Sequence, residues 1–418
     1  MKELFSLLSV GCVGTLVAAS TVTVDSVAQN AETRDVTVSY TLEGDPAIVT
    51  FDVTTNGASV GGVNLVCAYG GVNRLLTAGA HVFTWKPDFG DIGAAFAGGT
   101  AKVSVNAWAT NAPPAYMAIN LLHPEIRRFY DSAEAIPGGV TQTVYKTDWM
   151  VFRRIPAKDI VWRMGNNPTT NTGNWETFHY HNVMFTDDYY MSVFEVTRAQ
   201  YYLAQNWGNY YSFSDANDMA KPVLKNSAYS LRGNVKFPES DVLSNSTVGR
   251  MRSFLGLPGL EVPTFAQWEY AARAGTGTQW FFGETDDDLG DYAWYDANAG
   301  GSVHDVGMKK PNAFGLYDIY GNADEPVRES TASYYGLSSN IRTDASLVAT
   351  NPAGPATCGS SGMSCGGNFS CGTKNGVKDT SRLTSWKADG FTYSNTPNNA
   401  GIRLVAPAVI PFTPETED

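Results

Sequence analysis

The sequence predicts a β-rich protein in which an all-β, immunoglobulin-like sandwich precedes a larger α+β unit. At 418 residues, the chain is long enough for two or three domains of about 150 residues each. Its 41 Gly and 20 Pro residues, together with 10 Trp, 21 Tyr and 20 Phe, are typical of strands and turns rather than long helices. Alternating apolar and polar residues in the first third of the chain locate the sandwich.

The first twenty residues, MKELFSLLSVGCVGTLVAAS, have the order of an export signal: one Lys, an apolar run and small residues. The apolar run at residues 4–19 is short for a membrane span, and polar residues follow it. We therefore expect residues 1–20 to be a cleaved leader of a secreted or cell-surface protein that has no other membrane span. A retained anchor is the alternative.

Residues 31–122 have the pattern of a β-sandwich. The segments DVTVSYTL, AIVTFDVTT, HVFTWKP and AKVSVNAWAT alternate apolar and polar side chains, and turn residues separate them. The polar stretch at residues 123–144, which contains Pro-Gly-Gly, is expected to be a linker. A second domain then spans residues 145–408, and residues 409–418 form an acidic tail.

Capping sequences predict the helices of the second domain. Thr197 and Thr264 each precede a helical run and have a glutamine three residues later, which is the capping-box pattern. Gly275 is expected to end the second of these helices in the left-handed conformation. A third helix is predicted at residues 247–255, because its apolar residues recur at helical spacing.

Five blocks of this second domain resemble the formylglycine-generating enzyme (sulfatase-modifying factor) family. In chain order they are YYMSVFEVTRAQY, VPTFAQWEYAARAGTGTQWFFG, VGMKKPNAFGLYDIYGNADEP, GGNFSC and NAGIRLV. The resemblance covers roughly residues 145–406 and does not touch residues 1–140. It implies a C-type-lectin-like α+β fold with little regular secondary structure. Glu195 and Glu269 match family positions and are expected to support the fold, the second through a pair with Arg273 one helical turn later.

The family's enzymes bind Cu(I) through two cysteines, and the copper activates O₂ to oxidise a cysteine of a protein substrate. Cys371 matches the first of these cysteines, but Gly376 stands at the second, and Asn368 replaces the serine of the family's GGS turn. If residues 365–371 form one extended strand, Cys365 lies ~20 Å from Cys371, too far to share a metal. The resemblance therefore implies a scaffold that has lost its catalytic pair. A copper-dependent oxidase that uses Cys371 on a cysteine-containing protein is the alternative.

The turn GNADEP offers oxygen ligands for a hard cation. Asn322 and Glu325 lie three residues apart in it, and the corresponding family turn, Gly-Asn-x-Trp-Glu-Trp, holds a Ca²⁺. The resemblance thus implies a structural calcium site at Asn322, the carbonyl of Ala323 and Glu325, although Asp324 and Pro326 replace the two tryptophans. The alternative is a turn that Asn322 stabilises through hydrogen bonds to its own backbone.

Two further expectations concern cysteines and partners. Cys358 and Cys365 flank the flexible loop GSSGMS, and a disulfide between them would contribute about 2.5 kcal/mol. The net charge of −12 repels phosphate backbones, which argues against nucleic acid as a partner. Loops rich in Tyr, Trp and Asn are typical of contact surfaces for proteins or glycans, and core packing explains them equally well.

Together these features predict an exported, non-catalytic binding or structural protein. Its expected partners are other protein chains or surface glycans, and self-assembly into a fibre or surface layer is a narrower version of the same prediction. Structural Ca²⁺ is the expected cofactor, whereas copper belongs only to the oxidase alternative.

Overall fold

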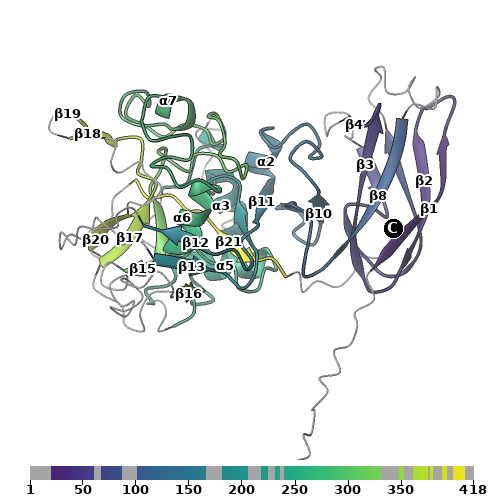
Figure 1. Cartoon of the computed structure of the whole chain (residues 1–418), viewed down its shortest axis with the longest axis horizontal. Coiled ribbons are helices and arrows are strands. Elements are labelled where there is room, and N and C mark those ends of the chain that lie inside the picture. The colour runs from purple at the N-terminus through teal and green to yellow at the C-terminus, as the bar shows by residue number, and fades with distance from the viewer. Residues whose placement is uncertain are drawn as a thin grey trace, which may run out of the picture.

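The computed structural model places the N-terminal strands at one end of the long axis, and the later elements extend from beside them to the other end (Figure 1). The predicted leader up to residue 19 and the tail from residue 410 lie outside the described part of the chain. The structure describes residues 20–60, 67–86, 101–165, 181–205, 218–224, 231–235, 240–330, 348–352, 361–374, 377–379, 388–392 and 399–409.

Two antiparallel sheets form the N-terminal sandwich, which confirms the predicted fold class of this region. Its strands are β1 (Thr21–Gln29), β2 (Val36–Glu43), β3 (Ala47–Thr55), β4 (Ala58–Ser59), β5 (Cys67–Gly70), β6 (Arg74–Leu76), β7 (Gly79–Lys86) and β8 (Ala101–Ala109). One sheet has the order β1-β2-β7-β5, and in the other β3 pairs with β4, β6 and β8. Val36, Val38, Tyr40 and Leu42 of β2 are at most 1% exposed, so the alternation of the sequence becomes the core face of the strand.

The sandwich begins and ends earlier than the range of 31–122 read from the sequence. β1 pairs with β2 from Thr21 to Gln29, although most of its side chains are exposed and it therefore shows little apolar pattern. β9 (Tyr116–Asn120) pairs with β10 (Arg127–Tyr130) and with β11 (Trp149–Ile155) in the C-terminal unit. Alternation reveals that a segment is a strand but not which sheet it joins, because any sheet buries one face in the same way.

The three helices predicted from capping sequences are present. The side chains of Thr197 and Thr264 each accept a hydrogen bond from the N–H of the glutamine three residues later, and each glutamine bonds back to the cap. The helix after Thr264 ends at Ala274, which takes the left-handed conformation (φ 48°) one residue before Gly275. The described helices are α2 (Val144–Thr147), α3 (Arg198–Gln205), α5 (Thr247–Phe254), α6 (Phe265–Arg273) and α7 (Leu289–Tyr292).

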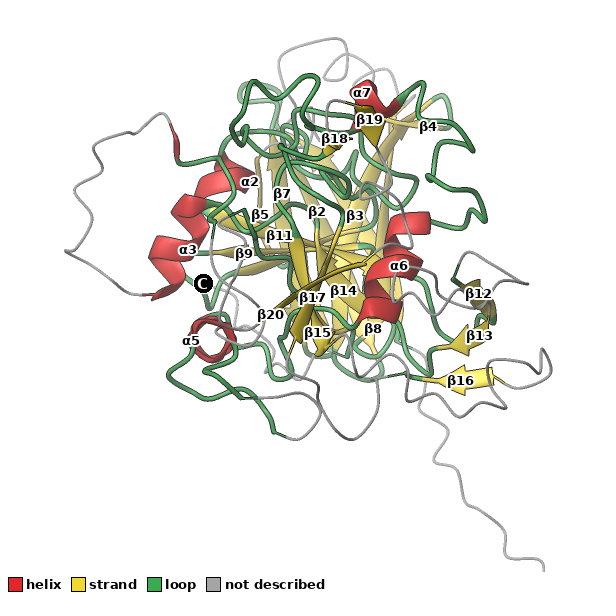
Figure 2. Cartoon of the chain, turned by 90° about the vertical axis from the view of Figure 1, so that its left-hand side faces the viewer, coloured by secondary structure: helices red, strands yellow, loops and turns green. Residues whose placement is uncertain are grey.

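A five-stranded antiparallel sheet is the centre of the C-terminal unit. Its order is β10-β9-β11-β14-β21, where β14 is Tyr189–Ser192 and β21 is Val405–Pro407. Tyr189 and Met191 pack in the apolar cluster of α6, whereas Tyr190 packs in the cluster of α3 and α5. Both faces of β14 are therefore buried, and Figure 2 shows α3 and α6 on opposite sides of β11 and β14.

Short strands connected by long loops surround this sheet, which agrees with the predicted α+β fold. β15 lies beside β17, and β17 lies beside β20; β13 lies between β12 and β16; β18 pairs with β19. Their bounds are β12 (Trp162–Met164), β13 (His181–Met184), β15 (Glu325–Ser330), β16 (Val348–Thr350), β17 (Ser361–Cys365), β18 (Gly372–Lys374), β19 (Val377–Asp379) and β20 (Ala388–Thr392).

The sandwich packs directly against the C-terminal unit. Ile48 of β3 and Leu75 of β6 belong to the same buried cluster as Met117 of β9 and Phe129 of β10. The Phe129 N–H also donates to the carbonyl of Asn73 at 3.0 Å. The stretch expected to be a linker is therefore part of the packed structure, because β10 lies within it and contacts the sandwich.

Candidate functional site

The turn at residues 321–325, where the sequence suggests a cation site, is buried in the C-terminal unit. Gly321 has φ 76°, and a Cβ there would lie 2.2 Å from the carbonyl oxygen of Trp294, so only glycine fits. The Asn322 N–H donates to the same carbonyl at 2.8 Å. This close approach directs the Asn322 side chain into the protein, where it is 0% exposed.

The Asn322 side chain bonds to other segments of the chain rather than to its own turn. Its Oδ1 accepts a hydrogen bond from the His304 N–H at 2.9 Å, and its Nδ2 donates to Glu195 Oε2 at 2.7 Å. The other oxygen of Glu195 accepts from the Ala323 N–H at 2.8 Å. Glu195 therefore holds the turn against the chain that follows β14.

Glu325 opens β15, and both of its carboxylate oxygens have partners. Its Oε1 lies 2.7 Å from Arg403 Nε, and its Oε2 accepts from Trp268 Nε1 at 2.6 Å. Arg403 donates in addition to the carbonyls of Ser192 and Tyr317, each at 2.8 Å. Such additional hydrogen bonds offset the desolvation cost of a buried ion pair.

Burial dominates the electrostatics of this network. It raises the pKa of Glu195 well above its usual range, and the neighbouring carboxylates of Asp318 and Glu325 raise that pKa further. Burial likewise raises the pKa of Asp318 to about 6, and it raises the pKa of Glu325 against the opposing effect of Arg403. Asp318 Oδ2 accepts from the Gly307 N–H at 2.6 Å, while its Oδ1 has no hydrogen-bond partner in the described structure.

This arrangement does not fit a calcium ion. Ca²⁺ takes about six to eight oxygens that converge on one point. Here the side-chain oxygens of Asn322 and Glu325 accept from N–H donors on separate segments of the chain. Within the described ranges, no three His, Cys, Asp or Glu side chains form a group that could hold a metal. Asn322, Ala323 and Glu325 lie together, and their contacts hold the fold.

Cys371 lies in the interior of the C-terminal unit. It is 3% exposed within the apolar cluster of α6, and its sulfur accepts from the Asn368 N–H at 3.3 Å. The chain from Cys365 to Cys371 is not one extended strand, because Gly366 (φ 81°) and Gly367 (φ 67°) are in the left-handed region and the Cys371 N–H donates to the Asn368 carbonyl in a turn. Cys365 packs in the same cluster, so the separation of ~20 Å argued for an extended strand does not apply.

The remaining cysteine predictions involve residues outside the described structure. Neither Cys358 nor Gly376 is described, so the disulfide between Cys358 and Cys365 stays a prediction. Cys365 is 1% exposed. Both described cysteine side chains therefore lie in the interior of the C-terminal unit.

Two positions at which the chain departs from the family pattern contact each other. Asn368 stands where the family has serine, and its Nδ2 donates at 2.7 Å to Oδ2 of Asp324, which stands where the family has tryptophan. Asn368 Oδ1 accepts from the N–H and the hydroxyl of Ser370 at 2.8 Å and 2.7 Å. Asn368 and Asp324 are buried, Ser370 is exposed, and their hydrogen bonds stabilise the turn that leads to Cys371.

Sequence reasoning found some members of the network and missed others. Glu195 and Glu269 support the fold as expected, and Glu269 pairs with Arg273 at 2.7 Å. Arg403 and Asp318 were missed. The arginine inside the apolar run AGIRLV was an available signal, because a buried guanidinium requires a carboxylate or carbonyl partner.

The fold and the turn around Cys371 define the class of the C-terminal unit as a formylglycine-generating-enzyme-like domain. Residues 155–408 match the family described as the sulfatase-modifying factor enzyme 1-like domain. The match covers more than half of the chain, and the chain belongs to this family.

Several individual proteins are similar to this chain. The chain is similar to Treponema denticola variable protein 1, with 20% identity, coverage of 62% of this chain and 95% of that chain, and a TM-score of 0.47. It is also similar to PvdO from Pseudomonas aeruginosa, with 19% identity, coverage of 62% and 94%, and a TM-score of 0.42. A segment of 87 residues is 33% identical to the chaperone protein LppX of Paenibacillus barcinonensis and spans 31% of that protein and 17% of this chain.

No helix in the part of the chain that the structure describes is both long enough and apolar enough to cross a membrane.

Proposed function

We propose that this chain is an exported binding or structural protein that keeps the formylglycine-generating fold without its oxidase chemistry. The observation that supports this most directly is the enclosure of Cys371, which is 3% exposed and accepts a hydrogen bond from the Asn368 N–H. Catalytic cysteines sit in partly exposed surroundings, whereas buried structural cysteines are inert. The burial of Cys371 therefore supports a structural role for this side chain rather than a reaction with a cysteine of another protein.

Two features of the sequence support the same proposal. Gly376 occupies the position of the second thiolate, and Cu(I) of this chemistry needs two. The contact between Asn368 and Asp324 joins two residues that differ from the family pattern beside Cys371.

The proposed site of action is outside the cell, with protein chains or surface glycans as partners. The leader-like order of residues 1–20 supports export, since a charged start, an apolar run and small residues are what secretion machinery recognises.

Copper binding tests the absence of oxidase chemistry. Reduced full-length protein and its Cys371→Ser variant are titrated with Cu(I) without oxygen, in competition with a chromophoric chelator. We expect the two titrations to coincide, because the buried sulfur does not contribute a site. A stoichiometric Cu(I) site that disappears in the variant would contradict the proposal. So would conversion of a cysteine-bearing peptide to its aldehyde under air, if Cys371→Ser abolishes it.

Self-assembly is supported by the edge strand β1. Among the described strands it pairs with β2 alone, and Val24 and Val27 are 38% and 41% exposed. An exposed strand edge of this kind can pair with a strand of another chain. Electron microscopy of concentrated protein tests this version: we expect fibres or layers that Val27→Lys prevents. Monodisperse single particles at every concentration would contradict assembly and leave the binding role intact.

A further inference from the structure

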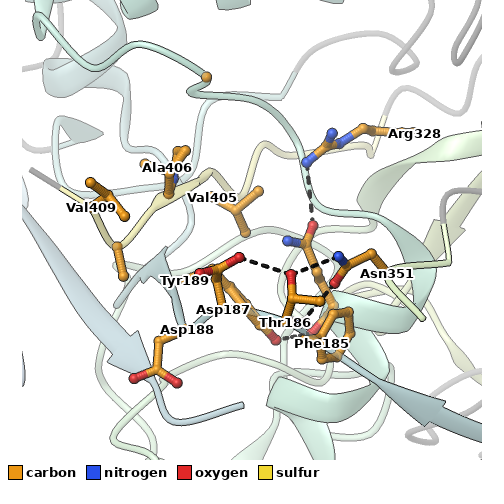
Figure 3. A pocket seen from close by; sticks show the side chains of 14 residues that line it. Phe185, Thr186, Asp187, Asp188, Tyr189, Arg328, Asn351, Val405, Ala406 and Val409 are labelled. Carbon is orange, nitrogen blue, oxygen red and sulfur yellow. Dashed lines mark hydrogen bonds between the residues drawn. The ribbon is translucent and has the colours of Figure 1, made fainter. Parts of the chain in front are cut away.

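A pocket distinct from the turn around Cys371 opens beside β14 and β21 (Figure 3). Its volume is about 380 Å³, which is enough for a small ligand or one long side chain. Its lining includes residues 185–189, 405–409 and Arg328, and neither Cys371 nor Glu325 is part of it. The proposed function therefore makes no use of this pocket.

The pocket has one polar wall and one apolar wall. Thr186 and Asn351 bind each other through two hydrogen bonds, from the Thr186 N–H to Asn351 Oδ1 at 3.0 Å and from Asn351 Nδ2 to Thr186 Oγ1 at 2.8 Å. The Thr186 hydroxyl then donates to Asp187 Oδ2 at 2.8 Å, which orients that carboxylate. Val405 and Val409 belong to the apolar wall, and Val409 is 50% exposed at the surface.

Asp187 provides the charge that this pocket offers to a ligand. Within the described structure its partner is the neutral hydroxyl of Thr186, and Asp187 takes part in no ion pair. The adjacent Asp188 is already satisfied, because its Oδ1 accepts from the N–H groups of Ala157 and Lys158 and its Oδ2 lies 3.8 Å from Arg154. In Figure 3 the Asp187 carboxylate lies beside Thr186, whereas the Asp188 carboxylate points away.

Arg328, a cationic residue of the pocket lining, donates hydrogen bonds to protein groups. Its Nε donates to the Val262 carbonyl at 2.6 Å, and its Nη2 donates to Gln267 Oε1 at 3.3 Å. Burial lowers the pKa of Arg328, and the carboxylates of Glu261 and Glu329, which do not line the pocket, oppose that shift.

We propose that this pocket binds a lysine side chain presented by another protein. The ammonium contacts Asp187, and the aliphatic stem lies along the wall that contains Val405 and Val409, as lysine stems commonly do on apolar surfaces. Oδ2 of Asp187 already accepts a hydrogen bond from Thr186, which leaves Oδ1 for a ligand. A lysine ammonium can bind one oxygen, whereas an arginine guanidinium binds best to both oxygens of a carboxylate, so the pocket favours lysine. The net charge of −12 favours approach of a cationic partner.

Capped tripeptides with a central lysine, ornithine, acetyl-lysine, arginine or glutamate test the proposal by calorimetric titration of the full chain. We expect the lysine peptide to bind and the acetyl-lysine peptide to bind about tenfold more weakly or worse, because it lacks the charge. Loss of one methylene in ornithine should weaken binding about fourfold if the stem packs on the apolar wall. Added salt should weaken the lysine peptide most.

A matched pair of variants locates the site. Asp187→Asn keeps the shape of the side chain and should weaken the lysine peptide about tenfold. Asp287→Asn is the control, because Asp287 is exposed and accepts from the Thr285 hydroxyl at the same 2.8 Å but lies outside the pocket. Circular dichroism checks that both variants fold.

Several outcomes would overturn the lysine pocket: no binding of the lysine peptide at millimolar concentration, equal binding of lysine and acetyl-lysine peptides, tighter binding of arginine, or equal losses in the two variants. None of these results depends on copper binding by Cys371, so this inference and the proposed function fail separately.

Discussion

Glu325 and Arg403 show how a residue that suggests a metal ligand can serve the fold instead. Both are at most 1% exposed, and Arg403 Nη2 lies 2.6 Å from Glu325 Oε1. At a solvent-exposed position such a pair contributes little to folding stability. In the interior, removal of one partner leaves the other charge buried without compensation. Asp291 and Lys310 form a contact of similar length, 2.7 Å, with both side chains more than half exposed.

The Glu325→Gln variant should therefore lose about 3 to 5 kcal/mol of stability. Urea unfolding followed by tryptophan fluorescence measures the loss. The control, Asp291→Asn, should unfold at the same urea concentration as the wild type, because solvent already screens that pair. If both variants behave like the wild type, the buried pair does not contribute as argued.

Glu329 makes stability depend on pH. Burial raises its pKa to about 7, and it is 2% exposed with its Oε2 accepting from the Phe265 N–H. Below about pH 4.5 the group is protonated in both the folded and the unfolded chain, so it has no differential effect. As the pH rises from there to 7, the unfolded chain releases the proton first, and the folded state loses relative stability.

We expect Glu329→Gln to become more stable relative to the wild type across this window, by up to about 3 kcal/mol at pH 7 and above. The measurement is the difference between the two unfolding free energies at several pH values from 4 to 8. Asp318, with its own raised pKa, is present in both proteins and cancels from the difference. A difference that does not change with pH would contradict the assignment.

Among the elements, α6 depends on its cap because it begins in the middle of the core. Thr264 accepts from the Gln267 N–H at 3.1 Å, and Gln267 Oε1 accepts from the Thr264 N–H at 3.0 Å. Trp268 lies at the fourth position of this helix, is 0% exposed, and donates a hydrogen bond from its Nε1 to Glu325. The start of the helix therefore sets the position of a group in the buried network.

Thr264→Ala should cost about 1 kcal/mol, because the Gln267 N–H at the helix start loses its side-chain acceptor. Thr264→Ser keeps the hydroxyl and should stay within a few tenths of a kcal/mol of the wild type. Thermal unfolding followed by circular dichroism compares the three proteins. Equal losses in both variants would point to the methyl group of Thr264 rather than to the cap.

At the scale of the whole molecule, alternation along β3 connects the two units. Val49 and Phe51 pack in the sandwich core, whereas Ile48 points the other way into the cluster of the C-terminal unit and is 0% exposed. A charge at residue 48 would thus disturb the contact between the units while sparing the sandwich core.

Ile48→Glu should separate the unfolding of the two units into two calorimetric transitions, where the wild type shows one. Val82→Glu is the control, since Val82 lies on β7 of the same sandwich and is 46% exposed. It should keep the single transition. Two transitions in the wild type would show that the units unfold independently despite the shared cluster.

Local patterns predicted much of the fold. Alternation located β2, β3 and β8, and the capping boxes located α3 and α6, because both signals depend on neighbours within a few residues. The boundaries at β1 and β9 were missed, since strand pairing depends on partners far along the chain. Resemblance identified the family over most of the C-terminal unit, as the match at residues 155–408 confirms.

By itself, the sequence determined the β-rich class of the protein and its family, because both are written in residue identity and spacing. Only the tertiary structure decided what Asn322 and Glu325 do. Their oxygens meet N–H donors from His304, Trp268 and Arg403, which are as many as 78 residues away in the chain. The folded chain also enclosed Cys371 and left Asp187 facing a pocket, since burial and charge balance arise from side chains that only folding brings together.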